Sequence, residues 1–86
     1  MTIDGITFDL VPLDWGVAAK LEQMGVDYRN WQDRPVAFAV GMFAVSAGLD
    51  FQDAAQHVSS HIQAGGNIDE FLDRVVAVVD AVHGTM

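Results

Sequence analysis

The chain has 86 residues, 51% of them hydrophobic and 19% charged, and its net charge is -8 because twelve acidic residues face four basic ones. This length accommodates one hydrophobic core, so we expect a single domain over residues 1–86. Nucleic acid and anionic membrane surfaces are not expected partners, because both require clustered Lys and Arg. The chain has no cysteine, which excludes disulfides and thiol chemistry and fits a reducing cytoplasm.

Residues 1–10 are predicted to form a short β-hairpin. Apolar and polar residues alternate over Ile6–Leu10, which is the period of a half-buried strand. The preceding Asp4-Gly5 pair is the preferred sequence for a two-residue turn in which both residues take positive φ. Only a very short strand precedes that turn, so we expect the hairpin to be stabilised by packing against the helices or against another chain.

Helices are predicted from apolar spacing and from the residues that cap each end. Asp14 and Asp50 are N-cap candidates, and Pro35 suits a first helical position. Asn67 and Glu70 form a capping-box pattern, and glycines follow the ends of the first three helices. The predicted helices cover residues 14–24, 35–47, 51–63 and 68–82.

The helix predicted over residues 35–47 is apolar on nearly all sides, which is typical of a central helix covered by its neighbours. The most apolar run, Val36 to Leu49, holds about fourteen residues, whereas a bilayer span needs about twenty. We therefore expect a buried core helix and no membrane segment. The whole pattern predicts a mainly α fold, a compact bundle of about four helices with a short N-terminal β-hairpin.

Asp53, His57 and His61 recur every four residues on the helix over 51–63, so they share a sector of about 80° away from its apolar stripe. A divalent metal can bridge side chains at this spacing. The outer side of a helix supplies no partners to orient the ligands, and no HExxH glutamate accompanies the pair. We therefore favour two polar surface histidines, with no metal and no cofactor.

Catalytic patterns are not found in the sequence. The serines do not stand in a GxSxG setting, and no glycine-rich phosphate loop is present. Carboxylates are frequent because the protein is acidic, and none can be assigned to a cleft from sequence. We expect a protein that is not an enzyme.

Surface charge and exposed aromatic residues supply the candidates for binding a protein partner. Asp69, Asp73 and Asp80 share a narrow sector of the last helix. This sector is either a solvated face that keeps the protein soluble or a rim of charge that orients a basic partner, and both interpretations can hold together. The helix over 35–47 presents more apolar surface than a small core can hide, so we also predict a homo-oligomer. The aromatic candidates, which face a partner or else pack internally, are Trp15, Tyr28, Trp31, Phe38 and Phe43.

The order of these parts resembles a known family. The parts are a strand pair over Ile3–Leu10, the run Pro12–Trp15, a helix ending at Met24-Gly25, a connection ending at Arg34-Pro35, an apolar helix, the run Leu49–Ala54 and a final amphipathic helix. This layout is similar to the small tail assembly chaperones of long-tailed bacteriophages, which are acidic and mostly helical. The similarity covers most of the chain and carries over no active-site residue.

The resemblance implies a cytoplasmic protein-binding module, in the host cytoplasm if it is encoded by a phage. Its implied partners are the hydrophobic tape measure protein, which it would keep soluble, and the tail tube subunit, which it would help to recruit. A host protein with the same bundle would show the same pattern. The alternatives from the residues alone are an acidic inhibitor that mimics the charge of nucleic acid, and a small oligomeric structural or adaptor subunit.

Overall fold

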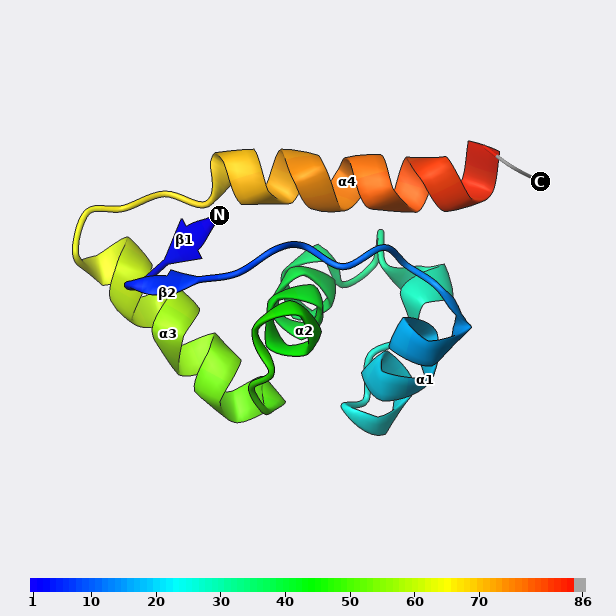
Figure 1. Ribbon diagram of the computed structural model, residues 1–86, viewed down its shortest axis with the longest axis horizontal. Helices are drawn as coiled ribbons and strands as arrows, with labels where there is room; N and C mark the ends of the chain where they lie inside the picture. The colour runs from blue at the N-terminus through cyan, green and yellow to red at the C-terminus, as the bar shows by residue number, and fades with distance from the viewer. Residues whose placement is uncertain (85–86) are drawn as a thin grey trace.

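The computed structural model describes residues 1–84, and the side chains of residues 1–81. Within this part the chain forms four α-helices and a two-stranded antiparallel hairpin (Figure 1), which confirms the predicted fold class. The elements in chain order are β1 (Thr2–Ile3), β2 (Ile6–Thr7), α1 (Trp15–Gln23), the 3-10 helix η1 (Tyr28–Asn30), α2 (Pro35–Ala47), α3 (Phe51–Gln63) and α4 (Asp69–Gly84).

Local capping signals set most of the boundaries. The Asp14 carboxylate accepts the backbone N–H of Val17 at 2.8 Å, and the Asp50 carboxylate accepts that of Asp53 at 2.8 Å, so both predicted N-caps are confirmed. Gly48 ends α2 in the left-handed conformation with φ 73°. The fourth helix differs slightly from the prediction: it begins at Asp69, where the N–H of Leu72 donates to the carbonyl of Ile68.

The hairpin forms around the predicted turn, but its ladder is shorter than residues 1–10. Asp4 and Gly5 have φ of 53° and 78°, as a two-residue turn of this kind requires. Thr2 pairs with Thr7 and Ile3 with Ile6. Phe8 also exchanges two backbone hydrogen bonds with Met1, and the segment from Asp9 to the start of α1 has no partner strand.

Helix α2 is the centre of the bundle. In Figure 1 it lies between α1 and α3, and α4 crosses above it. Seven consecutive residues, from Phe38 to Ala44, are buried, so every side of the helix over about two turns is covered. The predicted central helix is therefore confirmed, but the prediction that it leaves excess apolar surface is wrong, because α4 and the N-terminal segment cover it.

Three phenylalanines join segments that are distant in the sequence. The ring of Phe8, in the N-terminal segment, lies 5.0 Å from Phe43 on α2 and 5.8 Å from Phe71 on α4, measured between centroids. The rings of Phe43 and Phe71 lie 6.4 Å apart. All three side chains are buried, and their tilted and edge-to-face arrangements are the favoured ones for aromatic pairs.

Gly41 lets α1 and its following loop approach α2 closely. A Cβ atom at this position would lie 2.8 Å from Cδ2 of Leu21 and 3.4 Å from Cγ2 of Val26. Leu21 is fully buried, so its side chain has little room to move aside. The absence of a side chain at Gly41 is therefore part of the packing.

We predict that Gly41→Ala lowers the free energy of unfolding by about 1–3 kcal/mol, because the added methyl group overpacks the core. The matched control is Gly16→Ala in the first turn of α1, where the chain is exposed and the nearest atom, Oδ1 of Asp14, lies 3.3 Å away. Alanine normally stabilises a helix relative to glycine by up to about 1 kcal/mol. Urea denaturation of both variants is the measurement, and equal effects at the two sites would contradict the packing argument.

Candidate functional site

An open groove runs between the extended N-terminal segment and α4. Its volume is about 600 Å³, a size that suits part of a ligand or of a partner chain. The two walls come from opposite ends of the described chain. The N-terminal wall consists of Met1, Asp9 and Leu10, and the α4 wall of Glu70, Arg74, Ala77, Val78 and Ala81.

The core residues beside the groove determine which side chains line it. Phe8 is buried, and because successive side chains of an extended segment point to opposite sides, Asp9 is exposed. On α4 the buried stripe that includes Val79 turns Ala77 and Ala81 away from the core. These two alanines lie one helical turn apart and give the groove a floor without large side chains.

The charged groups that line the groove are the Met1 ammonium, Asp9, Glu70 and Arg74. Nη2 of Arg74 lies 3.6 Å from Oε1 of Glu70 in an exposed pair one turn apart, a geometry that adds little stability. The pair offsets the only cation among the α4 residues that line the groove. Asp9 has no ion-pair partner in the described part of the chain, but the terminal ammonium of Met1 lies on the same wall, so the charges of the lining balance.

The acidic face predicted on the last helix lies along the edge of the same groove. Asp69, Asp73 and Asp80 are all exposed, and at 3.6 residues per turn they fall within a sector of about 40°. Ala77, in the groove, follows Asp73 by about 40° around the helix. The carboxylates therefore border the groove on its solvent side.

The aromatic candidates divide into three groups. Trp15, at the start of α1, is 83% exposed and free to contact a partner. Tyr28 and Trp31 are half-buried against the core, and the Trp31 ring lies 6.0 Å from that of Phe38. Phe38 and Phe43 are buried in α2, so the structure corrects their candidacy: neither side chain can contact a partner while the bundle is folded.

Large exposed apolar side chains are scattered over the surface. Among the described residues they are Trp15, Val36, Ile62 and Val76, one on each helix. Ile62 continues the apolar spacing of α3 in the sequence, but half of its side chain is exposed, because the last turn of that helix faces the hairpin through His61. Because most of α2 is covered, the apolar surface expected on this helix is reduced to Val36, and the homo-oligomer stays a prediction.

The two polar surface histidines have a structural role that the sequence did not indicate, because His57 and His61 hold the hairpin turn against α3. Nδ1 of His57 donates to Oδ2 of Asp4 at 2.8 Å, and the backbone N–H of Asp4 donates to Nδ1 of His61 at 3.1 Å. Both imidazoles are half-buried. The helical pattern of α3 showed which side is apolar, but not that the hairpin would dock beside it.

Both ring nitrogens of His61 are occupied by hydrogen bonds. Nδ1 accepts from Asp4, and Nε2, which lies 3.2 Å from the carbonyl oxygen of Asn67, donates to it. The ring also packs on Gly66, where a Cβ atom would lie 2.5 Å from Nε2. His61 in this tautomer has no free lone pair for a metal. Within the described residues, no three His, Cys, Asp or Glu side chains are placed to hold a metal ion, and Asp53 is exposed.

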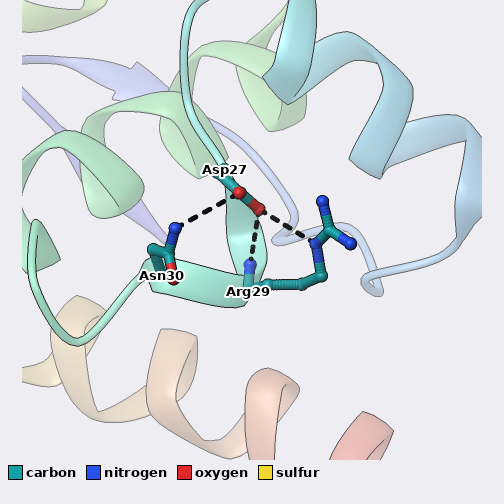
Figure 2. A network of polar contacts seen from close by, with 3 residues as sticks. All are labelled: Asp27, Arg29 and Asn30. Atoms are coloured by element: carbon teal, nitrogen blue, oxygen red, sulfur yellow. Dashed lines mark hydrogen bonds and ion pairs between the residues drawn. The ribbon is translucent and has the colours of Figure 1, made fainter.

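A second hollow of about 440 Å³ lies beside the connection between α1 and α2, next to Asp27, Asp33 and Arg34. Figure 2 shows that the Asp27 carboxylate organises this connection. Its Oδ1 accepts the backbone N–H of Arg29 at 2.9 Å and Nε of Arg29 at 3.4 Å, and its Oδ2 accepts from Asn30 at 3.4 Å. The carboxylate is used to cap η1, so this hollow offers no free catalytic group at Asp27.

Sequence reasoning did not find the groove residues Asp9, Leu10, Arg74, Ala77 and Ala81. The alternation over residues 6–10 placed Asp9 on the outer side of the strand, which was a usable signal. Nothing local in the sequence indicated that α4 would lie beside that strand. A groove between two distant segments depends on tertiary packing.

In the described residues no single helix is long and apolar enough to cross a membrane. Helices α2 and α3, which meet at an angle of 107°, pass that test as a pair by length and composition.

Comparisons of the chain with protein families, with curated proteins and with solved structures find no match. The functional argument therefore depends on the surface described above.

The contact between His61 and Gly66 predicts an energetic coupling. Gly66→Ala should lower the free energy of unfolding by about 1–2 kcal/mol, because its methyl group displaces the imidazole from the hairpin turn. In a His61→Ala background the same change should cost little, giving a coupling of about 1 kcal/mol in a double-mutant cycle. Urea denaturation of the four proteins measures it. An equal cost of Gly66→Ala in both backgrounds would contradict the proposed packing.

Metal addition gives a separate prediction. Zinc or nickel at modest excess should leave the melting temperature unchanged, because a metal must bind the folded state to raise it and His61 has no free nitrogen. Differential scanning fluorimetry is sufficient. A rise of several degrees that His61→Ala abolishes would instead establish the Asp53, His57 and His61 metal site.

Proposed function

We propose that this chain is a non-enzymatic protein-binding module that acts as a tail assembly chaperone of a long-tailed bacteriophage. The observation that supports this proposal is the groove beside α4, which has small apolar side chains on its floor and carboxylates along its edge. A surface of this kind suits a partially apolar protein client. Catalysis usually needs titratable groups in a desolvated pocket, and no charged or polar side chain is buried among residues 1–81.

The proposed client is the tape measure protein, and the proposed place of action is the host cytoplasm. Helical segments of that protein would dock apolar side chains against the chaperone before tail assembly, as amphipathic helices do in grooves. The net charge of -8 would keep the complex soluble while the client is still unassembled. Recruitment of tail tube subunits would follow, and the finished tail would not retain the chaperone.

The acidic face of α4 favours one alternative, an inhibitor that mimics the charge of nucleic acid. Only 12 of the 86 residues are acidic, which is sparse for such a mimic, so we place it second. Salt dependence separates the two proposals. The binding of a charge mimic to its partner should weaken steeply as salt rises, whereas binding through apolar contacts should not.

Co-expression with a candidate tape measure protein tests the proposal directly. The soluble fraction of the client should rise several-fold with the wild-type chain relative to no partner. Trp15→Glu should lose much of this effect, because Trp15 is the most exposed apolar side chain of the described residues and aromatic anchors dominate many interfaces. We choose it over Trp31, which packs on Phe38, because a charge there would also disturb the core.

Gln23→Glu is the matched control, since it adds the same charge at an exposed site on α1 without removing an aromatic ring. Reversing Asp69, Asp73 and Asp80 to lysine should slow association and change its salt dependence while leaving much of the affinity, because edge charges act mainly on encounter. Equal client solubility with and without the chain would refute the chaperone proposal. Complete loss of binding from the triple reversal alone would favour the charge mimic.

A further inference from the structure

We infer that the groove between the N-terminal segment and α4 is the docking site for a partner helix whose narrow apolar stripe is flanked by lysine or arginine. This inference rests on the proposed function, because it names the chemistry of the client segment and the surface that receives it. Four observations carry it: the shape of the groove, the rigidity of its walls, its charge, and the acidity of the chain itself.

The floor of the groove fits the backbone of another helix. Ala77 and Ala81 are exposed and lie one turn apart on α4, and the half-buried Val78 and Leu10 flank them. Helices approach to about 8–10 Å between axes, and small side chains at the contact allow the shorter distance. A client helix with a stripe of medium-sized apolar residues would fill the volume of about 600 Å³ between α4 and the N-terminal wall.

The walls are held in place before any partner arrives. Met1 and Phe8 exchange two hydrogen bonds, of 2.9 Å from the terminal ammonium to the Phe8 carbonyl and 2.8 Å from the Phe8 N–H to the Met1 carbonyl. His57 and His61 tie the hairpin turn to α3. Preformed walls reduce the conformational entropy that docking would otherwise cost.

The charges around the groove favour a partner helix with basic flanks. The lining itself is balanced, because the Met1 ammonium accompanies Asp9 on one wall and Glu70 offsets Arg74 on the other. The excess negative charge lies on the Asp69, Asp73 and Asp80 face that borders the groove. Basic residues on the flank of the client stripe beside α4 would therefore meet this row of carboxylates, and those on the other flank would meet Asp9. A helix with acidic flanks would meet like charges, which oppose its docking.

The same argument excludes a second copy of this chain as the occupant. With twelve acidic and four basic residues, the chain has few basic residues to flank an apolar stripe. Its own α4 carries the acidic face, and α3 carries no lysine or arginine. A partner of opposite charge is the complementary one.

Synthetic peptides test the inference on the full chain. One peptide of about 18 residues, or five turns, carries an apolar stripe flanked by lysines, and a second carries the same stripe flanked by glutamates. Fluorescence anisotropy of labelled peptides at low and physiological salt gives the affinities. The lysine-flanked peptide should bind at least about tenfold more tightly than the glutamate-flanked one.

The groove is tested with Ala77→Arg, which adds bulk and positive charge on its floor and should weaken the lysine-flanked peptide at least about tenfold. The matched control is Gln56→Arg, at an exposed helical position on α3 outside the groove and away from Trp15, which should leave binding nearly unchanged. A second pair compares Asp9→Asn with Asp33→Asn, of which only the first should reduce the salt dependence. Circular dichroism verifies that each variant is folded.

Equal effects of the two arginine variants, equal binding of the two peptides, or a dimer of this chain that Ala77→Arg dissociates would overturn the inference. The proposed function can fail separately. If the peptide binds the groove but no tape measure protein is made soluble, the groove assignment stands and the chaperone proposal falls. If Ala77→Arg still solubilises the client fully, the groove assignment falls and the chaperone proposal stands.

Discussion

The contact of Phe8, Phe43 and Phe71 is the interaction on which the arrangement of the remaining elements depends. It joins the N-terminal segment, the central helix and the last helix through rings whose centroids lie 5.0 to 6.4 Å apart. The groove follows from this contact, because Asp9 and Leu10 adjoin Phe8 while Arg74 and Ala77 follow Phe71 on α4. Since the rings fix the distance between these two segments, their outward-facing neighbours become the two walls. The proposed binding surface is therefore formed by the outward-facing neighbours of the core phenylalanines.

The parts of the fold that are encoded locally could be predicted from the sequence. Asp14, Asp50, Pro35 and Gly48 each act within one helical turn, through a hydrogen bond, a fixed φ or a positive φ, so the helix boundaries agree to within a residue or two. The two-residue turn at Asp4-Gly5 is of the same kind. The positions of the hairpin and of α4 depend on contacts between distant residues, and no periodicity contains that information.

The candidate site also contains some residues whose exposure local sequence could predict and others whose surroundings depend on contacts between distant segments. Exposure of Asp69, Asp73 and Asp80 followed from helical spacing, and Trp15 stands outside the apolar stripe of its helix. Phe38 and Phe43 were misjudged because a helix that is apolar all round looks the same whether its last side is covered or not. Here α4 and the N-terminal segment cover it. The hydrogen bonds of His57 and His61 were missed for a related reason: a polar sector on α3 is compatible with water or with a docked turn.

Three sides of helix α4 face three different surroundings: the core, the groove and the solvent. Phe71, Val75 and Val79 face the core, Ala77 and Ala81 line the groove, and the three aspartates face water beside it. In a chain that is 51% hydrophobic, exposed apolar surface carries a risk of unspecific association. Carboxylates along the edge of the groove would oppose that association between like chains, and they would attract the proposed basic partner over distances of about 10 Å at moderate salt. The same charges can therefore keep the free protein dispersed and select the partner that replaces water in the groove.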